Sequence, residues 1–189
     1  MPAKKPTAVF RRQDWVDLAV KTLRLEGPAR FTVDHLCRRA RRTKGSFYHH
    51  FKGIEELTGA VARDWAEGEG EAIGRAASAS GTAMERFRGL LTLTEAADHR
   101  LERGVRALTA NDPELGEIVR KADDRRELVT TTLLAAAYGI QGTEAHAFAR
   151  LFHAIHLAAP LRAPDDAASF TKSPSDALLA ILQSNFPTD

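Results

Sequence analysis

A segment of 21 residues, Phe31 to Phe51, constrains the fold most, because it contains two short helical patterns separated by a tight turn. Thr32 is placed to cap the first helix and Thr43 to cap the second. In the second, Phe47 and Phe51 lie four apart on one face. The apolar stripe of the first consists of Val33, Leu36, Cys37 and Ala40. This pattern is the outline of a helix-turn-helix, whose second helix enters the major groove of DNA.

The charge of the chain is unevenly distributed. Residues 1–52 carry 13 Lys or Arg against four acidic residues, a net charge of +9, whereas residues 53–189 have a net charge of −7. The whole-chain value of +2 therefore hides a basic head on an acidic body. A polyanionic partner for the head explains this asymmetry. The alternative is that the arginines of the first pattern form only a solvated face.

From about Arg11 to Leu57 the chain resembles the DNA-binding domain of the tetracycline-repressor (TetR) family of transcriptional regulators. The resemblance is carried by Gly27 at the end of an amphipathic helix, by the Phe31-Thr32-Val33 entry, by the run KGSFYHHF at 44–51, and by Glu55-Glu56-Leu57. It implies an N-terminal three-helix domain that binds double-stranded DNA. The residues expected to contact phosphates or bases are Thr32, Arg42, Thr43, Lys44, Gly45, Ser46, Tyr48, His49 and Lys52.

The turn of the motif departs from the family pattern. Family members usually have Gly followed by an aliphatic residue there, and this chain has Arg41 and Arg42. We therefore expect a residue with a side chain in the left-handed backbone region, at some cost in strain.

The remainder of the chain shows helical periodicity throughout, which predicts an all-α fold. A first helix runs through Trp15 and Leu23 and ends at Gly27-Pro28. A long helix, weakened by three glycines, is expected over about 53–79, and Pro174 is expected to open the last one. Between these lie expected helices at about 83–97, 98–110, 113–138 and 144–159.

Two domains are predicted: residues 1–52 as the DNA-binding domain and residues 53–189 as a helical domain for effector binding and dimerisation. The resemblance implies a homodimer in which the last two long helices of each subunit pair. Small residues at 145, 147, 149, 154 and 158 would permit close approach of helices. A twofold protein is expected to bind a palindromic operator.

The resemblance also implies a small effector held within the helical body. Ordinary core packing is the alternative explanation for each residue of the expected pocket. The candidates are Trp65, Phe87, Leu91, His99, Leu101, Tyr138, Phe148, Phe152 and His153.

The sequence predicts neither catalysis nor a cofactor. It contains no Glu-x-x-His pair, no Gly-x-Ser-x-Gly elbow and no phosphate-binding Gly-Lys-Ser/Thr loop. His153 and His156 are three apart on one helix, a pattern that can bind a metal. The preferred interpretation is one buried, hydrogen-bonded histidine and one solvent-facing one, so no metal site is predicted. The single cysteine, Cys37, is expected to be a packed thiol, and the absence of a leader or an apolar span predicts a cytoplasmic protein.

These observations together predict a sequence-specific transcriptional regulator, more readily a repressor than an activator, released from its operator by a small molecule. One alternative is a helical ligand-binding protein or enzyme with a vestigial helix-turn-helix. A second alternative is a protein that coats DNA without sequence preference.

Overall fold

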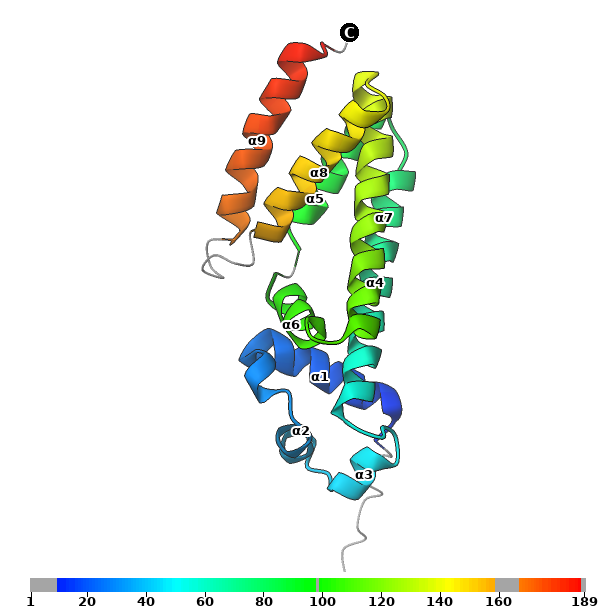
Figure 1. Cartoon of the computed structure of the whole chain (residues 1–189), viewed down its shortest axis with the longest axis vertical. Coiled ribbons are helices and arrows are strands. Elements are labelled where there is room, and N and C mark those ends of the chain that lie inside the picture. The colour runs from blue at the N-terminus through cyan, green and yellow to red at the C-terminus, as the bar shows by residue number, and fades with distance from the viewer. Residues whose placement is uncertain (1–9, 98, 159–166, 188–189) are drawn as a thin grey trace, which may run out of the picture.

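The structure, a computed structural model, describes residues 10–97, 99–158 and 167–187, and within these ranges it is all-α, as predicted. It forms an elongated molecule with a small head at one end and a helical body at the other (Figure 1). The elements are α1 (Arg12–Glu26), the 3-10 helix η1 (Pro28–Arg30), α2 (Val33–Ala40), α3 (Lys44–Tyr48), α4 (Ile54–Ser78), α5 (Ala83–Glu95), α6 (His99–Thr109), α7 (Pro113–Tyr138), α8 (Thr143–Ala158) and α9 (Ala167–Asn185).

The head is organised around an aromatic core. Trp15 of α1 and Phe47 of α3 are fully buried, with ring centroids 5.3 Å apart. The ring of Phe51 stacks on Phe47 at 5.6 Å, although α3 ends at Tyr48 and Phe51 lies beyond it. The predicted single helical face is therefore a short helix followed by an anchored residue. The first half of α4 packs into the same core through Leu57 and its neighbours.

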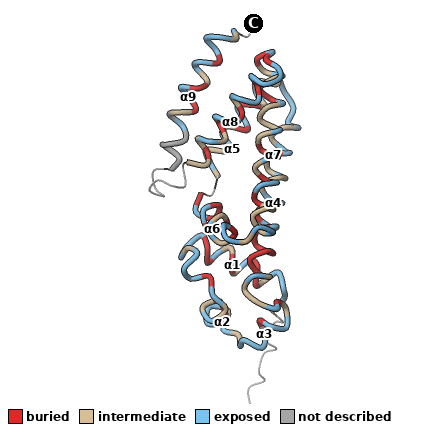
Figure 2. Tube along the Cα trace, viewed as in Figure 1, coloured by how far each residue is buried: buried red, intermediate tan, exposed pale blue. Residues whose placement is uncertain are grey.

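The body is a bundle in which α7 packs against α4, α5 and α8, and α9 covers α8 (Figure 1). Its core contains Phe87, Leu134, Phe152 and Leu182, and Figure 2 shows the buried residues along the inner faces of these helices. Asp112 caps α7 by accepting hydrogen bonds from the backbone of Glu114 and Leu115, each at 3.0 Å. No helix in the described ranges is long and apolar enough to cross a membrane.

Helix α4 continues without a break through Gly68, Gly70 and Gly74, the three glycines expected to weaken it. It contributes Leu57 and Trp65 to the core around the head and Ile73 to the core of the body. The two hydrophobic cores therefore share one helix. The domain boundary at residue 52 stays a prediction.

Two details of the body differ from expectation. Pro174 does not open the last helix but lies inside α9, which begins at Ala167. A proline removes one hydrogen-bond donor from a helix, and this favoured a boundary there in the sequence, but the helix accommodates it. Of the small residues on α8, Ala145 and Ala149 are fully buried in the body core, so they do not lie on an outer face. The predicted loop around Pro160 and Pro164 and the expected helix positions Asp98 and Ala159 lie outside the described residues.

The turn between α2 and α3 has the conformation that its sequence predicts. Arg41 adopts φ 52° and ψ 46°, the left-handed region, and is the single non-glycine residue with positive φ in the described part of the chain. The turn closes through a hydrogen bond from the Arg42 N–H to the Cys37 carbonyl, 3.0 Å long. The motif therefore tolerates the arginine at the cost of backbone strain.

We expect the substitution Arg41→Gly to raise stability by about 1 kcal/mol, because glycine adopts this conformation without the clash of a side chain. Thermal unfolding should show a rise of roughly 2–4 °C. Arg38→Gly, in the exposed interior of α2, is the matched control and should lower stability by about 1 kcal/mol. Equal effects of the two substitutions would contradict the assignment of strain to Arg41.

Candidate functional site

Two helix caps and one buried ring determine which side chains of α2 and α3 are exposed. The hydroxyl of Thr32 accepts a hydrogen bond from the His35 N–H at 3.3 Å, and that of Thr43 accepts one from the Ser46 N–H at 3.2 Å. Both predicted caps are confirmed. Because Phe47 is completely buried, its neighbours on α3 are turned outward. Tyr48 is 55% exposed, unusual for a large aromatic side chain.

The predicted DNA-contacting residues lie in or next to α2 and α3, the two helices at the tip of the head (Figure 1). Two of them are half-buried: Ser46, and Arg42, whose guanidinium lies 5.5 Å from the ring centre of Phe10. The exposed members of the set are Thr32, Thr43, Lys44, Gly45, Tyr48, His49 and Lys52. An open groove beside them is lined by Arg38, Arg41, Arg42 and Lys44. The tip is therefore a basic, polar surface with one exposed ring.

An ion pair at this surface was not anticipated from the sequence. Lys44 Nζ lies 2.7 Å from Asp34 Oδ1, and the two side chains are 60% and 58% exposed. The hydrogen bond and charge of Lys44 lower the pKa of Asp34, and the same contact raises the pKa of Lys44. A phosphate that binds Lys44 must share it with this carboxylate. The sequence did not predict this pair, because Asp34 and Lys44 are ten residues apart and lie on either side of the turn.

Cys37 is a packed thiol, as expected. It is 6% exposed against the head core, and burial raises its pKa, so the reactive thiolate is disfavoured.

The body contains a cavity of about 110 Å³ between α4, α5, α7 and α8, with Ser175 of α9 at its edge. Its apolar wall includes Ile73, Leu90, Leu91, Leu93 and Phe152. Its polar wall is formed by Glu69, Arg126, Thr130, His153 and His156. The lining of the cavity thus combines apolar side chains with a few hydrogen-bonding groups, as is common for small-molecule sites.

Three of the nine predicted effector residues line this cavity: Leu91, Phe152 and His153. Trp65 and Leu101 belong instead to the core around the head. Phe87 and Tyr138 pack in the body core, and Phe148 lies against it. His99 is buried beside His156, with ring centroids 5.4 Å apart. The predicted effector residues that do not line the cavity pack against other side chains of the two cores.

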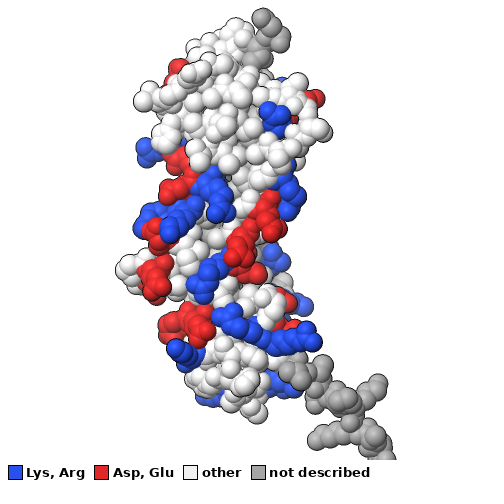
Figure 3. Space-filling model, turned by 90° about the vertical axis from the view of Figure 1, so that its right-hand side faces the viewer, with Lys and Arg blue, Asp and Glu red and all other residues white. Residues whose placement is uncertain are grey.

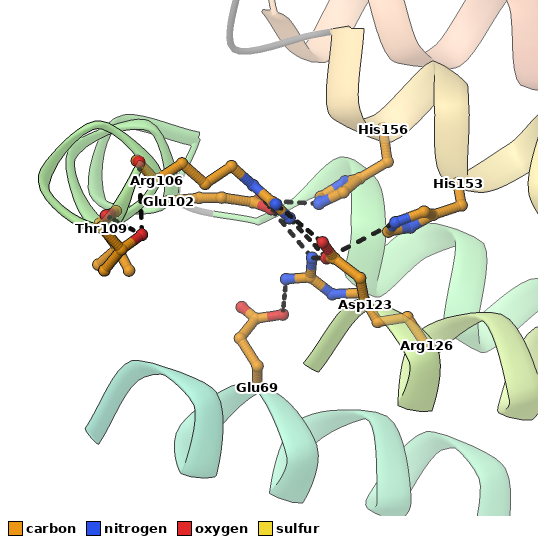
Figure 4. A network of polar contacts seen from close by, with 9 residues as sticks. Glu69, Glu102, Arg106, Thr109, Asp123, Arg126, His153 and His156 are labelled. Atoms are coloured by element: carbon orange, nitrogen blue, oxygen red, sulfur yellow. Dashed lines mark hydrogen bonds and ion pairs between the residues drawn. The ribbon is translucent and has the colours of Figure 1, made fainter. Parts of the chain in front are cut away.

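A partly buried network of charged side chains (Figure 4) adjoins the cavity, which Glu69, Arg126, His153 and His156 also line. At its centre is Glu102 of α6, which is 2% exposed. Its Oε1 accepts hydrogen bonds from Arg106 Nη2 at 2.8 Å and Arg126 Nη1 at 2.9 Å, and its Oε2 lies 2.8 Å from His156 Nε2. Arg106 also binds Asp123 in a two-pronged contact of 2.6 and 2.8 Å. The network joins α6, α7 and α8.

Helix α4 enters the same network through Glu69, whose Oε2 lies 2.6 Å from Arg126 Nη2. Burial opposes ionisation of Glu102, but the hydrogen bond to His156 and the positive charges around it lower its pKa well below the ordinary range. Glu102 is therefore a carboxylate at neutral pH. Sequence reasoning missed it because a single Glu in a charged helix is ordinarily a surface residue.

The expected division between His153 and His156 is only half right. His156 is buried and hydrogen-bonded, as expected, but the side chain of His153 is 13% exposed and faces the cavity and Asp123. Burial lowers the pKa of His153, so its ring is neutral at pH 7 and offers both a donor and an acceptor.

Helix α6 connects the polar network to the head. Gly104 lies so close to α1 that a Cβ atom there would come within 3.2 Å of Leu23 Cδ2 and 3.3 Å of Leu23 Cβ. Two residues earlier on the same helix is Glu102. A displacement of α6 would therefore act on α1 through this close contact.

The charges of the body are arranged in pairs. On the face drawn in Figure 3, Lys and Arg alternate with Asp and Glu over the lower and middle parts of the molecule, and the far end of the body is mostly uncharged.

The head and the overall fold both have counterparts among known proteins. Residues 16–61 match the family model described as bacterial regulatory proteins, tetR family. No curated protein matches. Among solved structures, the reduced form of Escherichia coli NemR is 17% identical, with a TM-score of 0.74 over 94% of this chain and 98% of that one.

Two further structures agree. A TetR-family transcriptional regulator from Streptomyces coelicolor is 17% identical, with a TM-score of 0.73 over 90% of this chain and 95% of that one. A complex of SmeT with triclosan is 19% identical, with a TM-score of 0.66 over 94% of this chain and 92% of that one. At such identities the likeness establishes a shared fold. The chain therefore carries the amino-terminal domain of the tetR family of bacterial regulatory proteins on a body with the fold of TetR-family transcriptional regulators.

Proposed function

We propose that this protein is a homodimeric, sequence-specific transcriptional repressor that leaves a palindromic operator when a small molecule enters the body cavity. The fold and the family domain support a DNA-binding transcriptional regulator. The observation that carries the proposal is the tip of the head, where the outward side of α3 presents Lys44, Tyr48 and His49 beside the basic groove.

Side-chain chemistry indicates which residues of this surface would contact phosphates and which would contact bases. Lys44 and Lys52 are point charges suited to phosphates, whereas Ser46 and His49 carry the hydrogen-bonding groups that read base edges. Tyr48 offers a ring for sugar or methyl contacts and a hydroxyl for a phosphate. The buried Phe47 fixes the direction in which all of them point.

Selection of bound duplexes from a random DNA library, at near-physiological salt, tests the proposal. We expect enrichment of a palindrome with half-sites separated by about one helical turn or a multiple. Weak, salt-sensitive binding without enrichment would favour a protein that coats DNA. No binding at all would favour a ligand-binding body with a vestigial head.

Lys44→Ala should weaken binding to all sequences and flatten the logarithmic salt dependence of affinity by about one unit, because one phosphate contact is lost. Fluorescence anisotropy over a salt series measures both quantities. Lys121→Ala is the control, since Lys121 is 72% exposed on α7 of the body. An unchanged slope in the Lys44 variant would remove its role at a phosphate.

The homodimer is proposed through α8 and α9. Leu151 on α8 and Ile181 on α9 are each 51% exposed, and Ala147 and Ala154 on α8 are exposed small residues. An apolar, small-residue surface of this kind suits close packing against a second helix pair.

Leu151→Asp should therefore give monomers in light scattering after size-exclusion chromatography, because a charge would be buried unpaired at the interface. Operator affinity should fall with it, since each half-site would be bound separately. Leu25→Asp, at a leucine that is 63% exposed on α1, should remain dimeric. A dimeric Leu151 variant would place the interface elsewhere.

For the effector, the cavity supports a ligand that is largely apolar with one hydrogen-bonding group facing His153. The SmeT structure was solved as a triclosan complex, and we propose that this chain binds its small molecule in the corresponding body. Release would follow from displacement of α6 against α1 at the contact between Gly104 and Leu23.

A further inference from the structure

A second binding function is indicated behind the polar wall of the cavity. His99 and Glu102 of α6 and His156 of α8 are all buried. Each offers one ligand atom, and the three atoms lie within 4.8 Å of one another. We propose that these residues form a binding site for a divalent transition-metal ion of the zinc type, with two imidazoles, one carboxylate and an open coordination position.

The donor set matches this class of ion. Zinc in proteins takes imidazole nitrogens at about 2.0–2.1 Å and carboxylate oxygens at about 2.0–2.2 Å, and two histidines with one glutamate form a known open site. Ligand atoms around one tetrahedral ion are about 3.3–3.5 Å apart, as these bond lengths require. The contact of 2.8 Å between His156 Nε2 and Glu102 Oε2 must therefore open slightly, and the wider separations must close. The proposal therefore requires small rotations of these side chains.

The surrounding network prepares Glu102 for this role. Both arginines bind its Oε1, so Oε2 is the oxygen directed at His156. The arginines in turn are neutralised by other carboxylates, since Arg106 pairs with Asp123 and Arg126 with Glu69. The three carboxylates and two guanidiniums carry a net charge of −1, which favours a cation.

The position of the site suggests that a bound ion would affect the contact between the body and the head. His156 also lines the cavity, so an ion bound at this site would lie beside the space proposed for the effector. The ion would connect α6 to α8 and fix the helix that contacts α1 through Gly104. This consequence rests on the proposed function, but binding of the metal does not.

The test is titration of the chelator-treated, full-length protein with Co²⁺ and with Zn²⁺, in the absence of DNA. We expect one ion per subunit by calorimetry, and visible absorption bands of four- or five-coordinate cobalt that zinc abolishes. His99→Gln and His156→Gln should each weaken binding at least about tenfold. His146→Gln, on α8 at a histidine that is 55% exposed, is the matched control and should bind as the wild type does.

Circular dichroism establishes that each variant is folded before titration. If the wild type binds no ion stoichiometrically, the proposal is wrong. It is equally wrong if both His99→Gln and His156→Gln keep wild-type affinity, since the ion would then sit elsewhere. Because the assay contains no DNA, failure of operator binding leaves this result intact, and the reverse also holds.

Discussion

Replacing Glu102 with glutamine is expected to lower the free energy of unfolding by about 3 kcal/mol, measured by urea denaturation in metal-free buffer. Glu102 is 2% exposed and accepts hydrogen bonds from two guanidiniums, so its neutral replacement leaves buried positive charge poorly compensated. Breaking a buried ion pair on one side costs about 3–5 kcal/mol. We expect the lower end of this range, because Asp123 and Glu69 still pair with the arginines.

Glu71→Gln provides the matched control for Glu102→Gln. Glu71 pairs with Arg75 at 3.5 Å on the surface of α4, with side chains that are 74% and 71% exposed. An exposed pair of this kind contributes less than about 0.5 kcal/mol. Similar losses in the two variants would show that the network around Glu102 is more hydrated than its burial indicates.

The second large effect is expected for Phe47→Ala, which should destabilise the head by about 3–5 kcal/mol. Phe47 is fully buried and contacts the rings of Trp15, Tyr48 and Phe51. Its removal leaves a cavity where α3 is anchored, so α3 also loses its orientation. We expect loss of DNA binding together with a fall in the unfolding midpoint.

Tyr48→Ala separates anchoring from contact. Tyr48 follows Phe47 directly but is 55% exposed, so its truncation should change stability by less than about 0.5 kcal/mol. If Tyr48 contacts DNA, as proposed, affinity should nevertheless fall. A Tyr48 variant as unstable as the Phe47 variant would mean that its ring is structural.

The fold was accessible from the sequence where the signal is local. Helical periodicity, the caps Thr32 and Thr43, and the left-handed turn at Arg41 depend on residues within a few positions of one another. The start of α9 could not be predicted from the sequence. Proline usually lies at the beginning of a helix, but this is a preference that tertiary context overrides. The end of α3 was also missed, since Phe51 keeps the spacing of a helix without being in one.

The candidate sites divide in the same way. The residues expected to contact DNA come from one continuous segment, so their spacing alone predicts that they share a surface. The cavity and the network around Glu102 draw on α4, α5, α6, α7 and α8. Which apolar residues line a cavity depends on how helices distant in sequence pack, and a charged residue such as Glu102 is buried only because its partners converge from other helices.

The length of α4 determines how far a small tilt of this helix moves the head relative to the body. A helix of 25 residues is about 37 Å long. With one end in the head core and the other in the body core, it acts as a rigid lever between them. A tilt of about 3° at one end displaces the other by about 2 Å, from the same rise per residue. A small rearrangement in the body would therefore shift the head, and in the proposed dimer it would change the spacing of the two heads.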